Sequence, residues 1–410
     1  MFTRHQKFIS HKQFTTAFCF LLTCAAATLA ANSNPAAKTN VLNKPKTAAD
    51  MKHQIIYKKD GIYACFPDLF ILPDGRLGTT FATRTARSHI DPAGGTLSMI
   101  SPDHGQTWQT TDQPLLDKKW KTKNGSFLRA RAPGWVYVPE ARLQQLRSSR
   151  KVILKAMPGT IAYLGGATLE TYDSTAKSWQ SHPIEIPKYI SGLMCHLLAA
   201  SDLRTSSNIR LTAVYGPRID PNLPNGRTKS EVFLLRSEDD GQSWKCRPMY
   251  PDGLPDPKKG FNETALAETA DGTIIAMMRP DPDGYLHQSN STDGGKTWSP
   301  PRNTGIWGTP AHLLRVDNNT IICTHGYRRN PLGIRACISR DGGKTWQTDR
   351  EIILRSDGYI KGYAHLGYPI TSRLPDGKLF TIYYMTTQKE KNNTHIASTI
   401  WQLPQKKQTN

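Results

Sequence analysis

The sequence predicts an all-β fold, a six-bladed β-propeller of four-stranded antiparallel blades with Asp-box turns. Two observations predict it: an eight-residue pattern with Asp and Trp recurs along the chain, and tight turns between short apolar runs precede most copies. The chain has 410 residues, of which 38% are hydrophobic and 9 are Trp. That length and composition exclude a minimal module, a disordered chain and collagen-like or coiled-coil structure.

The first residues predict an export signal. Arg4, Lys7 and Lys12 precede the apolar run 17–27, and small residues follow it, which is the order of a secretory signal peptide. We therefore expect residues 1–30 to be removed and the protein to be secreted or periplasmic. The apolar run is shorter than a membrane span, which needs about 20 residues, so no stable membrane insertion is expected.

The eight-residue pattern has four clear copies and one degraded copy. All five share an Asp and a Trp; the clear copies, at 101–108, 237–244, 291–298 and 339–346, also share a Gly, and the degraded copy is at 172–179. In each copy the Asp can accept backbone N–H groups, the Gly takes a positive φ, and the Trp packs back across the strands. The copies are therefore interpreted as hairpin turns and not as catalytic motifs.

The boxes and the earlier turns together define the blades. Tight turns lie at 72–77, 269–274, 316–321 and 374–379. The order strand, tight turn, strand, longer loop, strand, box turn, strand makes one blade, and repeated blades make a propeller. Residues 48–404 have room for six blades in one domain, with a strand near 394–403 closing the ring against the N-terminal segment.

Three stretches fall outside this regular pattern. Residues 31–47, rich in Asn, Ala, Lys and Pro, predict a flexible leader, and residues 405–410 form a tail. Residues 113–165 contain no clear box and carry many basic residues. They predict an irregular blade or an insertion.

Polar residues gather in the loops of one propeller face. Because alternate loops emerge on opposite faces, the box turns lie on one face, and the other face collects the second-to-third loops and the starts of the first strands. The second-to-third loops carry Arg84, Arg87, His89, Asp91, Arg279, Arg328, Arg329 and Arg335, and the first-strand starts carry His196, Glu263, His312 and Tyr368. We expect the functional site on that second face.

The sequence resembles the sialidase (neuraminidase) superfamily of Asp-box (BNR) repeat proteins. The likeness rests on the four clear boxes, on Asn-Glu-Thr-Ala-Leu at 262–266 with Met-Met-Arg at 277–279, and on Gly-Tyr-Pro at 367–369. It covers nearly the whole chain after the signal. The resemblance implies a retaining exo-glycosidase that acts on terminal sialic acid or a related acidic sugar, and the export signal implies that this enzyme is secreted.

The resemblance also implies a catalytic set. Tyr368 matches the family's nucleophile, Glu263 its carboxylate partner, and Asp91 the acid/base; such tyrosine nucleophiles are an exception to the usual two-carboxylate scheme. A phenol beside a carboxylate base attacks the anomeric carbon without charge repulsion from the substrate's own carboxylate, and a glycosyl-enzyme implies retention. A loop Asp would protonate the leaving oxygen and then activate water.

Three arginines hold the substrate carboxylate in this family, since guanidinium forks suit a planar carboxylate. Arg279 matches the second arginine. The third is most similar to Arg335, with Arg329 and Arg328 as close competitors.

The first arginine is replaced in this sequence. It belongs to an Arg-Ile-Pro motif in the family, whereas here Pro67 follows Cys65 and Phe66, so a cysteine takes its position. Either Arg84 or Arg87 reaches in from a neighbouring loop, or the pocket takes another acidic sugar.

The histidines on the same face are candidates for hydrogen bonds to sugar hydroxyls, although a lone histidine more often has a structural role. They are His89, His196 and His312.

Two alternative functions stay open. Cys65 favours another carbohydrate-active enzyme, a hydrolase or lyase on uronic or sulfated polysaccharide, and Glu263 with Tyr368 argues against a non-catalytic glycan-binding propeller. No P-loop, dinucleotide fingerprint or metal-ligand cluster appears in the sequence, so neither a cofactor nor a metal is expected. The formal net charge of +20 suits an acidic glycan partner or a basic surface, and nucleic acid is not expected. The sequence does not indicate an oligomeric state.

Overall fold

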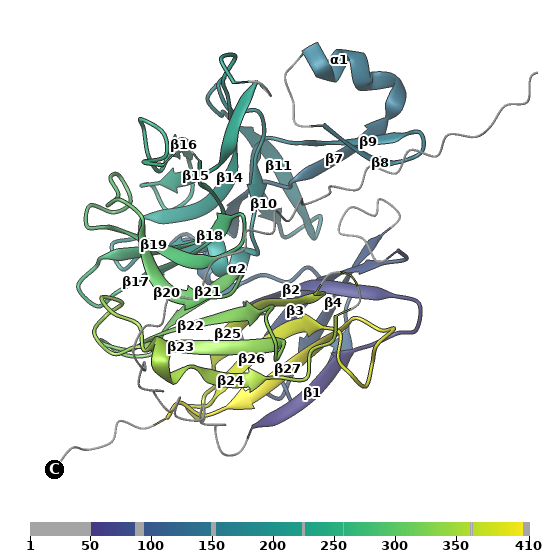
Figure 1. Cartoon of the computed structure of the whole chain (residues 1–410), viewed down its shortest axis with the longest axis vertical. Helices are drawn as coiled ribbons and strands as arrows, with labels where there is room; N and C mark the ends of the chain where they lie inside the picture. The colour runs from purple at the N-terminus through teal and green to yellow at the C-terminus, as the bar shows by residue number, and fades with distance from the viewer. Residues whose placement is uncertain are drawn as a thin grey trace, which may run out of the picture. The chain divides into compact units, whose positions relative to one another are not determined.

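Six antiparallel sheets follow one another along the chain as the blades of a β-propeller (Figure 1). The structure, a computed structural model, describes residues 51–86, 94–148, 153–223, 226–256, 258–360, 362 and 364–404. All of them lie in the compact unit Pro45–Asn410. The predicted six-bladed propeller is confirmed.

Three blades have the regular four-stranded form, with sequential strands as neighbours. The first contains β2 (Tyr63–Ile71), β3 (Leu77–Arg84), β4 (Gly95–Ser101) and β5 (Gln109–Thr110). The fourth contains β17 (Gly260–Glu268), β18 (Ile274–Asp281), β19 (Tyr285–Ser291) and β20 (Arg302–Trp307). The fifth contains β21 (Ala311–Arg315), β22 (Ile321–Tyr327), β23 (Gly333–Ser339) and β24 (Ile352–Arg355), with the 3-10 turn η3 (Thr348–Arg350) before β24.

The second and third blades are irregular. In its described residues the second blade has three strands, β6 (Leu128–Arg131), β10 (Ala167–Asp173) and β11 (Ser178–Ile184), preceded by η1 (Lys118–Trp120). Between β6 and β10 the chain forms an inserted sheet of β7 (Trp135–Pro139), β9 (Thr160–Leu164) and β8 (Ile153–Met157), with η2 (Glu140–Arg142) and α1 (Leu143–Ser148). The third blade contains β14 (Arg210–Ile219), β15 (Arg227–Ser237) and β16 (Lys245–Pro248), and both β12 (Met194–Cys195) and β13 (Asp202–Arg204) pair with β14. The stretch predicted to be irregular therefore holds an inserted sheet.

The sixth blade joins the two ends of the described chain. It contains β25 (Leu366–Arg373), β26 (Leu379–Met385), β27 (His395–Trp401) and β1 (Lys52–Tyr57). Strand β1 pairs antiparallel with β27, with Lys52 opposite Ile400 and Ile55 opposite Ala397, as the purple and yellow strands of Figure 1 show. The N-terminal strand thus closes the ring, as the sequence predicted.

The Asp boxes form the predicted turns. Asp103 Oδ1 accepts the N–H groups of Gln106 (3.1 Å) and Thr107 (2.8 Å), and the Thr107 hydroxyl donates to Asp103 Oδ2 at 2.6 Å. Gly105 has a φ of 89°, and Trp108 Nε1 donates to its carbonyl at 3.3 Å. Equivalent carboxylate bonds recur at Asp239, Asp293 and Asp341, and the degraded copy keeps two backbone bonds at Asp173. These aspartates hold turns.

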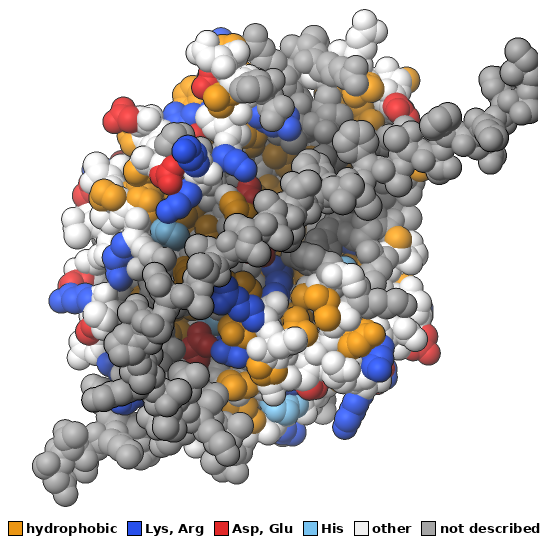
Figure 2. All heavy atoms as spheres, viewed as in Figure 1, with side chains coloured by type: hydrophobic (Ala, Val, Ile, Leu, Met, Phe, Trp, Pro, Cys, Tyr) orange, Lys and Arg blue, Asp and Glu red, His pale blue; other side chains and the backbone are white. Residues whose placement is uncertain are grey.

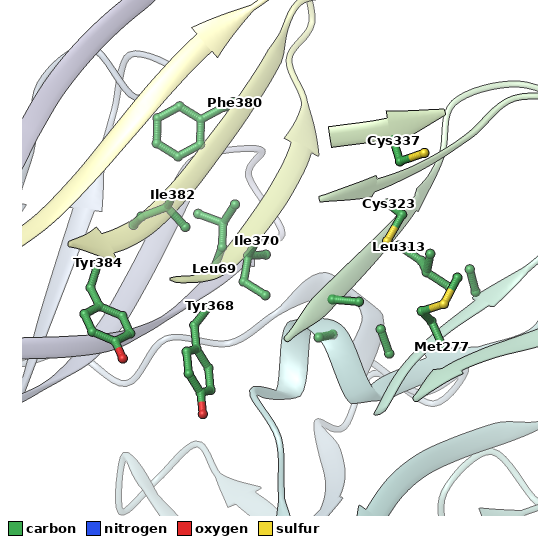
Figure 3. Packing of buried hydrophobic residues seen from close by; sticks show 14 of the residues in the cluster. Leu69, Met277, Leu313, Cys323, Cys337, Tyr368, Ile370, Phe380, Ile382 and Tyr384 are labelled. Atoms are coloured by element: carbon green, nitrogen blue, oxygen red, sulfur yellow. The ribbon is translucent and has the colours of Figure 1, made fainter. Parts of the chain in front are cut away.

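The core lies between neighbouring blades. Figure 3 shows one cluster to which β2, β18, β21, β25 and β26 contribute Leu69, Met277, Leu313, Ile370 and Phe380. The short helix α2 (Leu198–Ser201) packs in the centre against β2, β14, β17 and β21.

A buried carboxylate holds this central helix. Asp68 of β2 accepts the N–H groups of Leu198 at 2.8 Å and Ala199 at 2.9 Å, which caps the positive end of α2. At the other end, Lys119 Nζ donates to the carbonyls of Leu198 (3.0 Å) and Asp202 (3.1 Å). The centre of the ring is therefore fixed by polar bonds to two separate segments.

The cysteines and the surface charges add two further findings. All five cysteines in the described ranges are free thiols, and Cys323 of β22 lies opposite Cys337 of β23.

On the face shown in Figure 2, Lys and Arg side chains are scattered among acidic and neutral ones. Within the described ranges, no helix combines the length and apolarity needed to cross a membrane.

Candidate active site

Three inner strands bulge where they start, on the face opposite the Asp boxes. The register of pairing shifts at 65–68 in β2, at 261–264 in β17 and at 367–370 in β25. A bulge re-aims the side chain it carries, and bulges are over-represented beside active sites. Here the three bulges bring Phe66, Glu263 and Tyr368 to one cavity.

Two of these bulges are strained. Phe66 has a φ of 55° and Tyr368 a φ of 53°, a left-handed conformation that costs a bulky residue about 1–3 kcal/mol. The ring of Phe66 packs edge-on against that of Tyr368, with centroids 4.6 Å apart. Strain of this kind persists where the surroundings enforce it, which is typical of functional sites.

Tyr368 and Glu263 form a direct buried pair. The Tyr368 hydroxyl donates to Glu263 Oε1, and each residue is 8% exposed. Figure 3 shows the Tyr368 hydroxyl directed away from Ile370 and the rest of the hydrophobic cluster. Burial, together with the negative charge of Glu263, raises the pKa of Tyr368 well above its ordinary value. The phenol is therefore neutral and has a base beside it.

Glu263 is held ionised by an arginine. Burial alone would raise the pKa of Glu263, but Arg279 and the Tyr368 hydrogen bond act in the opposite direction and lower it to about 2. Arg279 Nη1 donates to Glu263 Oε2 at 2.6 Å, and Arg279 Nε donates to Asp283 Oδ1 at 2.8 Å. At neutral pH the carboxylate is free of its proton and can accept one from Tyr368.

A second arginine adjoins this group. Arg328 Nη1 donates to Thr309 Oγ1 at 3.3 Å and to Asp283 Oδ2 at 3.4 Å, and its Nη2 donates to the carbonyl of Leu366 at 3.3 Å. Asp283 therefore bridges Arg328 and Arg279. The structure brings Arg328 to the predicted site through contacts from three blades.

Arg84 lies near Cys65, the residue at the sequence position of the family's first arginine. It is the last residue of β3 and lines the cavity together with Phe66 and Tyr368. Burial raises the pKa of the Cys65 thiol to about 12, although the positive charge of the neighbouring Arg84 guanidinium opposes the shift. The guanidinium of β3 thus lies beside the cysteine of β2.

The cavity at these residues has a volume of about 1320 Å³. His196 and Tyr215 also line it, and the ring centroid of His196 lies 5.4 Å from that of Tyr368. Burial lowers the pKa of His196 to about 4, so the ring is neutral at physiological pH. Its Nδ1 has no hydrogen-bond partner among the described residues.

Two predicted arginines are engaged elsewhere. Arg335 Nη1 donates to Glu351 Oε2 at 2.8 Å, and its guanidinium stacks on Tyr327, 3.2 Å from the ring centroid. Arg329 stacks on Trp307 at 3.8 Å. None of the four predicted arginines at 279, 328, 329 and 335 lines the cavity formed by the described residues. Arg279 and Arg328 differ from the other two because Arg279 pairs with the cavity residue Glu263 and Arg328 is joined to Arg279 through Asp283.

Of the remaining predicted residues, His312 does not join this group. His312 is buried, and its Nδ1 accepts the N–H of Thr371 at 3.3 Å. Because burial lowers the pKa of His312 to about 3, its ring is a neutral part of the core. Asp91, Arg87 and His89 lie outside the described residues.

The sequence did not single out three residues of this site. Asp283, Thr309 and Tyr215 contribute to the arginine contacts or to the cavity wall. Asp283 lies in a predicted site-face loop four residues after Arg279, which is a usable signal. For Thr309 and Tyr215 the sequence contains no comparable signal. Within the described ranges, no group of three or more His, Cys, Asp or Glu residues could hold a metal ion.

Comparisons with known proteins agree with this architecture. Residues 211–381 match the family described as BNR repeat-like domain. The sequence matches none of the curated proteins with which it was compared. A crystal structure of a protein of unknown function from Dyadobacter fermentans is similar to the chain, with 24% identity and a TM-score of 0.68, over 86% of this chain and 99% of that one.

Two sialidases of known structure are also similar. The NanB sialidase of Streptococcus pneumoniae is 14% identical, with a TM-score of 0.55, over 85% of this chain and 70% of that one. The Trypanosoma rangeli sialidase in complex with 2,3-difluorosialic acid, a covalent intermediate, is 14% identical, with a TM-score of 0.54. This match covers 87% of the present chain and 60% of the trypanosomal one.

Proposed function

Because the chain is a BNR-repeat protein with the six-bladed propeller fold of the sialidases, we propose that it is a secreted retaining exo-glycosidase. Its substrate is a glycan that ends in sialic acid or a related acidic sugar. One observation carries the proposal: the buried Tyr368 hydroxyl donates to an ionised Glu263 at the wall of a large cavity. That pair supplies a nucleophile together with its base.

The reaction proceeds in two displacements. Tyr368 Oη attacks the anomeric carbon while its proton passes to Glu263 Oε1, and the bond to the leaving oxygen breaks as an acid protonates that oxygen. Water then attacks the glycosyl-tyrosine and gives one proton to the conjugate base of that acid, while Tyr368 leaves and regains its proton from Glu263. Two inversions give net retention.

Three arginines lie at the site and favour an acidic sugar. Arg279 pairs with Glu263 and Asp283, Arg328 hydrogen-bonds Asp283, and Arg84 lines the cavity. Arginine binds carboxylates with paired N–H groups. We assign to Arg84, which lies on β3 near Cys65 and lines the cavity, the role of the arginine that Cys65 replaces on β2.

Two parts of the proposal rest on the sequence. The acid that protonates the leaving oxygen is assigned to Asp91, in the loop after β3. Export is assigned to residues 1–30, whose basic and apolar order is that of a signal peptide.

The test is hydrolysis of sialyllactose by the purified protein, with the Tyr368→Phe variant beside it. We expect the variant to lose at least about 10³-fold in kcat. Tyr384→Phe is the matched control, because its ring lies 5.8 Å from that of Tyr368, although it is not among the residues that line the cavity. A 2,3-difluoro sugar should become attached to Tyr368, which mass spectrometry of the peptide detects, and NMR should show the retained anomer first.

One observation favours a second candidate function. The apolar ring of Phe66 packs on Tyr368 beside Cys65, the residue that replaces the family's first arginine. A substrate carboxylate at this place would meet an aromatic ring instead of a guanidinium. This supports a hydrolase or lyase on uronic or sulfated polysaccharide. Product analysis separates the two reactions, because a lyase leaves an unsaturated sugar and a hydrolase adds water. If wild type releases no product from any glycan tried and Tyr368→Phe is indistinguishable from it, both enzymatic proposals fail and a glycan-binding role remains.

A further inference from the structure

A second cavity is lined by residues of the first and second blades and of α2. Its volume is about 430 Å³, which lies within the range of about 300–1,000 Å³ of ligand pockets. The first blade contributes Thr80 of β3 and Ser98 of β4, which lie opposite each other in the strand pairing. The second blade contributes Arg129 and Arg131 of β6. The cavity therefore combines hydroxyl groups of one blade with guanidinium groups of the next.

The two arginines lie on one face of β6. They alternate along the strand with the buried residues Leu128 and Ala130, and alternate side chains of a strand point to the same face. Both arginines adjoin a single carboxylate, Glu170 of β10. Arg129 Nε donates to Glu170 Oε2 at 2.6 Å, whereas Arg131 Nε lies 3.8 Å from Glu170 Oε1. One carboxylate thus serves two guanidinium groups, and only one of them is hydrogen-bonded to it.

Both guanidinium groups retain N–H donors that are not hydrogen-bonded to any described residue. For Arg131 this is true of the whole guanidinium, and its side chain is 35% exposed. Arg129 donates through Nε alone, and its guanidinium contacts the rings of Trp120 and Trp179, at 4.7 and 4.0 Å from their centroids. Burial and the positive charge of Arg131 lower the pKa of Arg129, and Glu170 opposes this shift. An oxyanion beside the two arginines would offset their repulsion.

The other polar residues of the lining leave the arginines available. Asp68 also lines the cavity, but its carboxylate accepts the N–H groups of Leu69 at 3.1 Å and of two residues of α2. The hydroxyl groups of Thr80 and Ser98 are not hydrogen-bonded within the described part of the chain. His196 is 7% exposed and lines the cavity, and its Nδ1 has no partner there either. The cavity thus offers donors and acceptors that the fold itself does not use.

We propose that this cavity is a second ligand site, which binds an acidic sugar unit through its sulfate, phosphate or carboxylate group. The oxyanion lies at Arg129 and Arg131, because guanidinium groups bind such groups with paired N–H donors. The sugar hydroxyls bond to Thr80 and Ser98. The site is distinct from the reacting pair, since neither Tyr368 nor Glu263 lines it, although His196 lines both cavities. The inference goes beyond the proposed glycosidase and does not depend on cleavage.

Calorimetric titration with monosaccharides tests this site separately from the proposed reaction, because a free monosaccharide has no glycosidic bond to break. The probes are glucosamine 6-sulfate, glucose 6-phosphate and glucuronic acid, with glucose as the neutral reference and sodium sulfate as the free anion, all at one ionic strength. We expect at least one acidic sugar to bind about tenfold or more tightly than glucose. The absence of such a preference overturns the inference. Sodium sulfate bound as tightly as the best acidic sugar overturns the assignment of a sugar ligand.

Variants locate the bound sugar. Arg131→Gln should lower its affinity about tenfold or more, and Arg131→Lys, which keeps the charge and loses the paired donors, should recover part of the loss. Arg247→Gln is the matched control, because this exposed arginine of β16 is not among the residues that line either cavity. If Arg131→Gln does not fold, Ser98→Ala provides the second readout, with an expected loss of about threefold or more. Unchanged affinity in a folded variant of either kind overturns the assignment.

Arg328→Ala separates the two cavities. This change weakens the site at Tyr368, so the variant should retain the sugar binding that Arg131→Gln removes. The reverse order, with binding lost in Arg328→Ala and kept in Arg131→Gln, would place the acidic sugar at Tyr368 and overturn the second site. Binding at the second site by a protein that cleaves no glycan would refute the proposed glycosidase and leave this inference standing.

Discussion

Replacing Glu263 by Gln tests the ionised state on which the proposed chemistry depends. The pKa of Glu263 falls from 4.5 to about 2 in the folded protein, and each pKa unit corresponds to about 1.4 kcal/mol. Ionisation of this carboxyl beside Arg279 therefore contributes about 3 kcal/mol to the free energy of unfolding. Because the folded pKa is depressed, this contribution is fully present above pH 4.5 and disappears as the pH falls toward 2.

The Glu263→Gln variant isolates this contribution. The introduced amide keeps the shape of the side chain and cannot ionise, so the stability difference between wild type and variant should be largest near pH 7. It should shrink by about half at pH 3. Urea unfolding followed by tryptophan fluorescence at both pH values measures the difference. An identical difference at pH 7 and pH 3 would show that Glu263 is not ionised against Arg279, and the assignment of Glu263 as base to Tyr368 would fall with it. Arg279→Lys retains the positive charge and should preserve the pH dependence.

Three further outcomes are expected. Gly105→Ala should lower the free energy of unfolding by about 3 kcal/mol, because the φ of Gly105 is 89° and an added Cβ would lie 2.4 Å from a ring carbon of Phe380 on β26. Gly75 has a φ of 87° but open space around it, so Gly75→Ala should lower the free energy of unfolding by only about 1 kcal/mol. Urea titration measures both values. Arg328→Ala should lower kcat/KM on an acidic glycoside about 10- to 100-fold, whereas Arg335→Ala should change it little; the reverse order would place Arg335 at the substrate. Asp68→Ala removes the cap of α2 and should cost about 1–2 kcal/mol, seen as a lower Tm, and an unchanged Tm would contradict the capping role.

The propeller could be predicted because its turns are local in sequence. The Asp of each clear box bonds to backbone groups three or four residues later, and the Gly that follows adopts a positive φ within the same turn. Such contacts depend on the eight residues of the box and on little else. The inserted sheet after β6 has no comparable signal, because its strands are defined by pairing with one another.

The candidate site was predictable only in part. Glu263 and Tyr368 each lie eight residues before the Asp of the following tight turn, Asp271 and Asp376. Equal spacing puts the two residues at corresponding places on the first strands of two blades, where the structure shows them hydrogen-bonded. The choice between Arg328 and Arg335 could not be made in this way. The choice depends on partners from other elements, which are Asp283 for Arg328 and Glu351 for Arg335. The local sequence does not indicate that either pair comes into contact.

Closure of the ring by β1 has a consequence for how the protein is made. His53 on β1 hydrogen-bonds Thr399 on β27 at 3.0 Å, although the two residues are 346 positions apart in the chain. The first strand has no partner until the last has been synthesised, and pairing over such a separation makes folding slow. A ribosome-bound chain therefore cannot complete the last blade. A chain that stays open until its end has emerged can cross a membrane unfolded, so late closure of the ring is compatible with the export proposed from residues 1–30.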